Sequence, residues 1–321
     1  MLPGYNLNIP MVHGNQFLET NEEETNNRIL ELKKHKFILF NYCSEHWGPH
    51  NGLELMYDKF DQHGLNFILL SHDIYDHLTK PNLLFYPYWY HHSRIGITDH
   101  NYHRNISRLE KKFKISCLNG NPRFNRIYNY ILLKEKDYFK DLLFTFHDAD
   151  VFRHDDIVLD IDIQDKWNNI KNTLPNRPTS LSDIDINHDA YTNSYVNLVT
   201  ETTVIPKLFV TEKTWKPIAS GQLFMVLGSL GTIEYLRTQG VDTFDDIIDH
   251  KYYDNEPDWK IRISKIHELL DDLVKEDLYR MNEITQARRL KNAEKFYSGE
   301  FDIQYIDQLK QKVIVCTNTQ N

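Results

Sequence analysis

The sequence predicts an α/β protein made of two Rossmann-like halves followed by C-terminal helices. Short apolar runs typical of strands alternate with segments whose apolar residues recur at helical spacing, and this alternation occurs twice along the chain. Between the two series, residues 93–114 lose apolar periodicity and gain polar and basic residues, which is typical of a connection between domains. We therefore expect a first domain over residues 1–110 and a second over residues 111–321.

The first series follows a polar stretch rich in Asn and Glu. Its pattern is strand, helix, strand, strand, over residues 36–42, 51–60, 65–70 and 83–86. This order predicts one α/β layer, because apolar strands that alternate with amphipathic helices bury both kinds of element against each other.

The second series begins with a strand, a turn that contains Gly and Pro, and a helix, which is the usual opening of a Rossmann-like half. The predicted strands cover 113–118, 141–146, 195–200 and 223–227. The predicted helices cover 123–133, 166–173, a segment that starts near 211, and 232–238, with further helices from 257 to about 315. Strands that alternate with crossover helices predict a parallel sheet.

The composition narrows the class of protein. The chain has 321 residues, of which 40% are hydrophobic, so it can bury a substantial core. Its formal net charge is −9, which excludes a global basic field of the kind that attracts polyanions. The three cysteines lie far apart, no N-terminal leader is apparent, and no apolar run approaches the roughly 20 residues that span a bilayer. We expect reduced thiols and a cytoplasmic protein without a membrane span.

Residues 195–229 hold the densest group of residues suited to chemistry. A predicted strand ends at the carboxylate of Glu201, and Thr211 stands where a helix N-cap is expected. Gly221 then ends that helix before the next strand. The stretch therefore predicts a helix N-terminus beside the carboxyl end of a parallel strand.

The first turn of this helix carries Glu212 and Lys213. Free backbone N–H groups, the helix dipole and the charge of Lys213 together favour a diphosphate. Glu212 is suited to accept a hydrogen bond from a ribose or sugar hydroxyl, or to stabilise an oxocarbenium-like transition state. The same residues also fit an ordinary capped helix with a solvated Glu–Lys pair.

Three short runs in this stretch resemble the nucleotide-sugar motif of the α1,3-fucosyltransferase family. They are Glu201-Thr-Thr203, Phe209-Val-Thr-Glu-Lys213 and Ala219-Ser-Gly221. The runs also look like segments of uncharacterised phage and bacterial glycosyltransferases. The resemblance implies the GT-B fold, in which two Rossmann-like domains face each other across a cleft.

In that family the Glu of the Thr-Glu-Lys run faces the donor sugar and the Lys meets the diphosphate, so the resemblance gives these roles to Glu212 and Lys213. It also places four further residues at the donor, namely Glu201, Thr202, Phe209 and Thr211. Two departures concern the donor's identity: Thr202 replaces an Asn, and Phe209 lacks the hydroxyl of the family's aromatic residue.

A second anion site is predicted at the start of the helix over 123–133. Arg123 and Arg126 lie in its first turns, directly after the turn 119–122. The planar guanidinium group of arginine matches phosphate oxygens, and the resemblance places an arginine from this helix start on the donor diphosphate. Either arginine can take that place, and both also fit the surface of an ordinary helix.

The first domain is expected to bind the acceptor and to supply a general base, since transfer with inversion needs a group that accepts the acceptor's hydroxyl proton. Candidates follow predicted strands, where α/β sites form. Glu45 and Asp73 are the two carboxylates selected, with His46 and His72 beside them. The aromatic run 86–92 is suited either to stack on a sugar or to pack in a core.

The run Asp148-Ala-Asp150 has the spacing of a motif that binds Mg²⁺ or Mn²⁺ in the other glycosyltransferase fold. Because Lys213 and the two arginines can neutralise a diphosphate, we expect a transferase that needs no metal and no cofactor besides its donor.

The sequence thus predicts a glycosyltransferase that moves a sugar from a GDP- or UDP-linked donor to a hydroxyl of a carbohydrate acceptor. One alternative is a phage-type enzyme that glycosylates hydroxymethylated bases in DNA, for which the basic run from Arg104 to Lys114 is suited. Another is a binding module that keeps the fold without turnover. The oligomeric state is not predicted.

Overall fold

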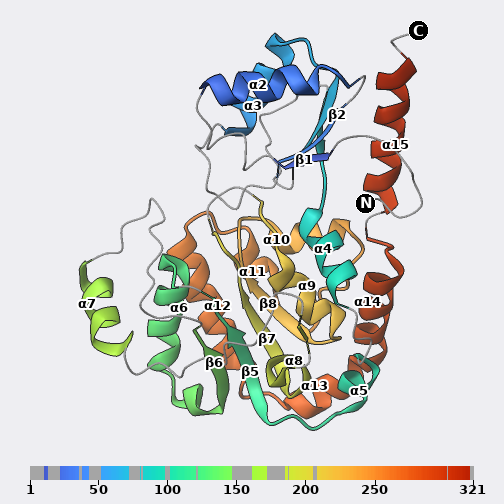
Figure 1. Ribbon diagram of the computed structural model, residues 1–321. Coiled ribbons are helices and arrows are strands. Elements are labelled where there is room, and N and C mark those ends of the chain that lie inside the picture. The colour runs from blue at the N-terminus through green and yellow to red at the C-terminus, as the bar shows by residue number, and fades with distance from the viewer. Residues whose placement is uncertain are drawn as a thin grey trace. The chain divides into compact units, whose positions relative to one another are not determined.

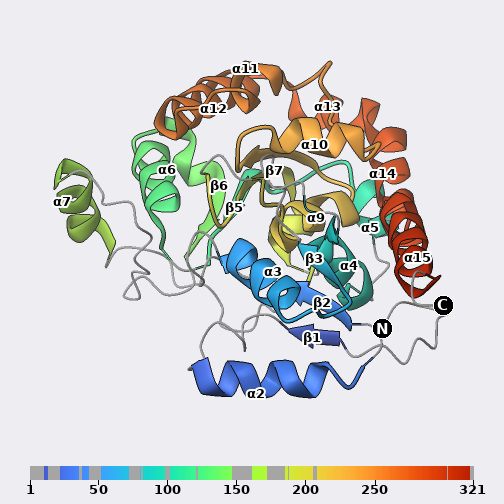
Figure 2. The same cartoon turned by 90° about the horizontal axis from the view of Figure 1, so that it is seen from above.

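The computed structural model describes residues 11–13, 22–35, 38–42, 52–71, 80, 82–97, 102–120, 122–146, 161–171, 185–186, 188–204, 208–301 and 303–318. The chain forms two compact units. The first comprises Met1–Tyr88 together with Asp302–Asn321, and the second comprises Trp89–Phe301. Figures 1 and 2 show the elements of both. This division differs from the expected boundary at residue 110, because residues 89–110 belong to the second unit and the last helix belongs to the first.

Two helices account for the first of these differences, namely α4 (Tyr88–Gly96) and α5 (Tyr102–Ser107). Tyr90 in α4 is fully buried, and its hydroxyl donates to the carbonyl of Phe296 at 2.9 Å. Asn105 in α5 is also buried, and its amide donates to the carbonyl of Ser220 at 2.6 Å. Both helices are therefore built into the second unit.

The first unit contains a parallel sheet whose strand order follows the chain, β1-β2-β3-β4. Its strands are β1 (Met11–His13), β2 (Ile38–Tyr42), β3 (Phe67–Ser71) and β4 (Leu83–Phe85). The crossover helices are α2 (Glu22–Leu32) and α3 (Gly52–Gln62). Because each strand is added on the same side, right-handed crossovers place both helices on one face.

Alternate residues of β2 and β3 serve the two faces of this sheet. Phe40 and Phe67 pack with Phe60 of α3, and the Phe40 and Phe60 rings lie 4.9 Å apart. The other face, which includes Ile68 in β3, packs against Leu309. Leu309 belongs to the last helix, α15 (Ile303–Asn318), which therefore completes the first unit.

The second unit contains a parallel sheet in the order β6-β5-β7-β8. Its strands are β5 (Phe113–Leu118), β6 (Leu142–Thr145), β7 (Ser194–Thr200) and β8 (Leu223–Leu227). The chain leaves β5 in one direction to reach β6 and adds β7 and β8 on the other side, so the strand order reverses between β5 and β7. All of β8 and nearly all of β7 are buried, which is typical of parallel strands covered on both faces.

The second unit holds the remaining helices. They are α6 (Phe124–Lys134), the 3₁₀ helix η1 (Asp137–Asp141), α7 (Ile161–Ile170), α8 (Asp189–Thr192), α9 (Glu212–Ala219), α10 (Thr232–Thr238), α11 (Lys251–Asp254), α12 (Trp259–Leu273), α13 (Leu278–Ile284) and α14 (Gln286–Ser298). Crossovers of one hand that run in opposite directions place α6 and α9 on opposite faces. Figure 1 shows α12 beside α6 and α14 beside α9.

The predicted mixed α/β architecture with parallel sheets is confirmed, and the strands over 113–118 and 223–227 match the predicted ranges. In the part of the chain that the structure describes, no helix combines the length and the apolar character needed to cross a membrane.

Candidate functional site

The carboxyl ends of β5 and β7 lie side by side, where the strand order reverses. Ligands of open parallel sheets bind at such a reversal. Here Thr200 Oγ1 donates to Asn119 Oδ1 at 2.5 Å, and the Asn119 N–H donates to the Thr145 carbonyl at 3.0 Å. We use the term carboxyl edge for the ends of β5 to β8 and the residues directly after them, and amino edge for the opposite ends of the same strands.

Glu201 follows β7 directly and is completely buried. One carboxylate oxygen accepts from the N–H of Thr211 at 2.9 Å and from the hydroxyl of Thr214 at 2.6 Å. The other accepts from the hydroxyl of Thr211 at 2.6 Å and from the N–H of Thr202 at 3.4 Å. The carboxylate predicted to bind the donor is thus occupied by protein donors, and it fixes the start of α9 against the end of β7.

Helix α9 begins as the sequence predicts. Thr211 is its N-cap, and the Thr211 hydroxyl oxygen accepts from the N–H of Lys213 at 3.3 Å. Lys213 Nζ lies 2.6 Å from a carboxylate oxygen of Glu212, whose side chain is only 7% exposed, whereas that of Lys213 is 26% exposed. The helix start therefore presents a cation that solvent reaches, paired with a carboxylate that solvent hardly reaches.

Burial alone raises the pKa of the Glu212 carboxyl, but the charge and hydrogen bond of Lys213 and the charge of Lys216 act against it. The net result is a pKa below the ordinary value of a glutamate. Glu212 is therefore ionised at neutral pH, as a group that stabilises positive charge has to be.

Helix α6 follows β5, the strand beside β7. Arg123 is its N-cap and Arg126 lies in its first turn. Both arginines are buried, and Arg126 Nη2 donates to the carbonyl of Thr200 at 3.3 Å. Burial and then the charge of Arg123 lower the pKa of Arg126 to about 10, whereas the charges of Glu201 and Glu212 raise it. Asn125 Nδ2 donates to the Glu201 carbonyl at 3.1 Å, and the Thr211 N–H donates to the Glu201 carboxylate, so the starts of α6 and α9 are both attached to the end of β7.

Several buried polar atoms at the carboxyl edge have no hydrogen-bond partner among the described residues. They are Asn125 Oδ1, Thr145 Oγ1, Ser229 Oγ and Arg262 Nη2. Arg262, from α12, is 1% exposed, and its Nη1 donates to the carbonyls of Gly228 at 2.5 Å and Val204 at 3.3 Å. A buried polar atom without a partner is costly, so such atoms indicate a place for water or a ligand.

Sequence reasoning did not identify Asn125, Thr145 or Arg262. Asn125 lies between the two predicted arginines, so its position in the helix start was its only signal. Arg262 lies in the region from 257 to about 315 that was predicted to be helical, and no local pattern connects it to β8. Only the packing of α12 against the sheet brings its guanidinium to the carboxyl edge.

The other predicted residues are either buried in the second unit or outside the described residues. The ring of Phe209 is fully buried, so it faces the protein interior. Thr202 is 7% exposed, and its N–H is directed to Glu201. The two candidate bases, Glu45 and Asp73, lie outside the described residues. His46, His72, Asp148 and Asp150 lie outside them as well.

Parts of the aromatic run and of the basic run belong to the interior. Tyr86 is buried in the first unit, and Tyr90 packs on Trp215 in the second with ring centroids 4.8 Å apart. Lys111 is 8% exposed, and its ammonium donates to the carbonyl of Asn105 at 2.7 Å and to the Asn105 side-chain oxygen at 2.8 Å. Lys114 donates to the carbonyl of Val274. These two lysines of the basic run are therefore engaged within the second unit.

Within the described ranges, no three side chains of His, Cys, Asp or Glu come together as a metal-ion site. No protein-family model, curated protein or solved structure matches this chain.

Proposed function

We propose that the chain is a nucleotide-sugar-dependent glycosyltransferase of the GT-B type, with the donor diphosphate bound at the carboxyl edge of β5 and β7. One observation carries the proposal: the starts of α6 and α9 bring Arg123, Arg126 and Lys213 to the point where the strand order reverses. Helix N-termini and arginine groups at such a point favour a diphosphate. The buried atoms without partners at the same edge support a ligand there.

Each charged residue receives a role in this proposal. Lys213 leaves its pairing with Glu212 in part and contacts the diphosphate, which its partial exposure allows. Glu212 stays ionised and faces the donor sugar, where it stabilises positive charge that develops at the anomeric carbon. Glu201 is a positioning residue, because its four hydrogen bonds hold the start of α9 in place.

In the proposed reaction, an acceptor hydroxyl oxygen forms a bond to the anomeric carbon while the bond from that carbon to the diphosphate breaks. The nucleoside diphosphate leaves with the bonding electrons, and Arg123, Arg126 and Lys213 stabilise its charge. A base takes the acceptor's proton, and Asp73 and Glu45 are the candidates. A carbohydrate is the proposed acceptor. DNA is less favoured as the acceptor, because Lys111 of the basic run is buried and Lys114 is hydrogen-bonded to the carbonyl of Val274.

The first experiment measures binding of GDP and UDP to the full chain by calorimetry. We expect one of them to bind and Lys213→Ala to weaken that binding by about 10- to 100-fold, since a charge-assisted contact is lost. Lys166→Ala removes a cation from α7, where its side chain is 56% exposed, and serves as the matched control. If neither nucleotide binds, or if both variants bind equally well, the diphosphate site is refuted.

The second experiment separates a transferase from a binding module. Glu212→Gln is expected to lower the turnover of the bound nucleotide sugar by about 10²- to 10³-fold while nucleoside diphosphate binding changes little. Sugar release to water or to a carbohydrate acceptor is followed by chromatography. A wild-type chain that binds the nucleotide and turns over none of its sugar conjugates contradicts the catalytic proposal and leaves the binding module.

A further inference from the structure

A cavity of about 330 Å³ lies in the second unit between the segment 246–249 and the helices α12 and α13. Its volume is at the lower end of the roughly 300–1,000 Å³ of ligand pockets, which suits a few side chains better than a large ligand. Apolar side chains form much of its lining, among them Ile248, Leu273, Met281 and Ile284. Ile284 is 54% exposed, so the apolar surface continues outward from the cavity.

The cavity lies toward the amino edge of the sheet and is distinct from the candidate donor site. The carbonyl of Val274, next to the cavity residue Leu273, accepts from Lys114 near the start of β5 at 3.0 Å. The amide of Asn282, next to the cavity residue Met281, donates to the carbonyl of Leu109 at 2.9 Å. An occupant of the cavity therefore leaves the carboxyl edge accessible.

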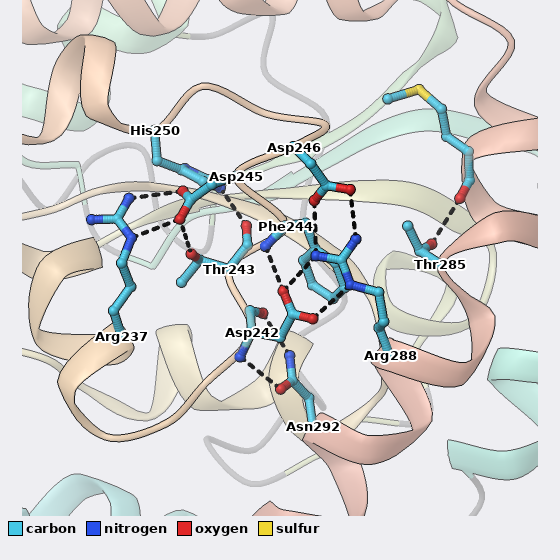
Figure 3. A network of polar contacts seen from close by, with 11 residues as sticks. Arg237, Asp242, Thr243, Phe244, Asp245, Asp246, His250, Thr285, Arg288 and Asn292 are labelled. Atoms are coloured by element: carbon cyan, nitrogen blue, oxygen red, sulfur yellow. Dashed lines mark hydrogen bonds and ion pairs between the residues drawn. The ribbon is translucent and has the colours of Figure 1, made fainter.

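Four carboxylates line the same cavity, from Asp246, Asp249, Asp272 and Glu276. Arg288 contacts Asp246 at 2.8 Å, but it also contacts Asp242 at 2.6 Å, as Figure 3 shows. One guanidinium is thus shared between two carboxylates.

Lys275, next to the cavity residue Glu276, compensates little of the carboxylates' charge. Lys275 pairs with Asp272, but both side chains are at least 70% exposed, and an exposed pair of this kind is screened by water. Among the described residues, no ion pair engages Asp249 or Glu276. The rim therefore carries a surplus of negative charge around an apolar floor.

We propose that this cavity docks a basic amphipathic segment of a partner protein. Apolar side chains of one helical face would enter the cavity and extend over Ile284, and lysine or arginine side chains beside them would meet Asp249 and Glu276. The charge of the rim decides the class of partner, because carboxylates repel nucleic acid and anionic lipid surfaces. This inference does not depend on the proposed glycosyl transfer.

The test uses the full chain and a fluorescein-labelled synthetic peptide of about 14 residues, with Leu on one helical face and Lys elsewhere. Two control peptides accompany it, one with the same residues in scrambled order and one with Glu in place of Lys. Fluorescence anisotropy at low and high salt measures the dissociation constants. We expect the Lys peptide to bind more tightly than either control and to lose affinity as salt increases.

Two pairs of variants locate the binding. The double variant Asp249→Asn, Glu276→Gln is expected to weaken binding about fivefold or more, whereas Asp162→Asn, Asp165→Asn removes the same charge from an exposed part of α7 and leaves it unchanged. Ile284→Ser is expected to weaken binding, whereas Ile261→Ser, at a site 48% exposed, does not. All six substituted positions, three at the cavity and three in the controls, are exposed, so folding is retained.

Equal effects of the cavity variants and their matched controls would show that the peptide responds only to the net charge of the chain, and would overturn the proposal. Binding of the Glu peptide as tightly as the Lys peptide would overturn it as well.

Discussion

Polar side chains are buried at both edges of the second unit's sheet, but the two edges differ in how far these side chains are hydrogen-bonded. At the amino edge, Ser194 Oγ donates to the carbonyl of Ala190 at 2.5 Å, Ser116 Oγ donates to the same carbonyl at 2.8 Å, and Gln222 Nε2 donates to it at 2.8 Å. At the carboxyl edge, Asn125 Oδ1, Ser229 Oγ and other buried atoms lack partners among the described residues. Satisfied polar groups hold a fold together, whereas buried groups without partners are typical of a site that receives a ligand.

The two edges also differ in the partners of their buried or half-buried cations. Lys111 at the amino edge is surrounded by carbonyl and amide oxygens, with acceptors from Asn105 and Thr192 and no carboxylate partner in the part of the chain that the structure describes. At the carboxyl edge, cations and carboxylates occur together, and Lys213 pairs with Glu212. A ligand with negative charge can replace part of such a pair, which is why we place the diphosphate there.

The largest expected effect comes from Glu201, which joins β7 to α9. Glu201→Ala leaves the N–H of Thr211 and the hydroxyl of Thr214 without their acceptor, so we expect a loss of about 3–5 kcal/mol in the free energy of unfolding of the second unit. Urea denaturation followed by circular dichroism measures it. Glu234→Ala, at a side chain 60% exposed, is the control. A loss below about 1 kcal/mol for Glu201→Ala would show that this carboxylate does not hold the helix start.

The next effect concerns Lys111 and pH. Burial, followed by the charges of Arg289 and Arg108, lowers the pKa of Lys111 from 10.5 to about 7. Between these values the unfolded chain binds a proton that the folded chain does not, so the free energy of unfolding rises as pH increases from 7. We expect a rise of about 1–2 kcal/mol between pH 7 and pH 9 that is missing in Lys111→Met.

The upper limit of pH 9 avoids the contribution of Cys117. Burial raises the pKa of the Cys117 thiol from 9.0 to about 12, so above pH 9 the folded chain retains a proton that the unfolded chain loses, and stability falls. Urea titrations at several pH values compare wild type with Lys111→Met. If both chains show the same rise, Lys111 does not titrate in this range.

The smallest expected effect is a difference in stability between two serine variants. Ser194 and Ser229 lie at opposite edges, and each is 1% exposed. Ser194→Ala removes the hydrogen bond to the carbonyl of Ala190 and is expected to cost about 1–1.5 kcal/mol. Ser229→Ala removes a hydroxyl that has no partner among the described residues and is expected to change stability by less than about 0.5 kcal/mol. Thermal unfolding of the two variants side by side measures the difference. Equal losses would remove the distinction between the edges.

Local signals predicted the start and the end of α9 well. Thr211 is the N-cap as expected, and Gly221 follows the helix with φ of +66°, a conformation that glycine adopts readily. Such features depend on a few neighbouring residues, so a single sequence is enough to recognise them. The strand over 223–227 was recognised in the same way, because all five residues are apolar and buried.

Contacts between distant segments were beyond such reasoning. The Glu201 carboxylate is held inside the protein by hydrogen bonds from Thr211 and Thr214. These residues come later in the chain, and the fold brings them to Glu201. Arg262 reaches the carboxyl edge through the packing of α12. The place of α15 in the first unit depends on which apolar face is left uncovered there, and no pattern within the helix encodes that.

Helix α15 also sets an order of events during synthesis. Its residues emerge from the ribosome after the whole of the second unit, residues 89–301, yet Leu309 packs on Ile68 and Leu84 of the first sheet. One apolar face of that sheet therefore stays uncovered while the second unit is made, and the unit that begins first is completed last. A chain at this stage combines an intact second unit with a first unit that is open to chaperones and to self-association.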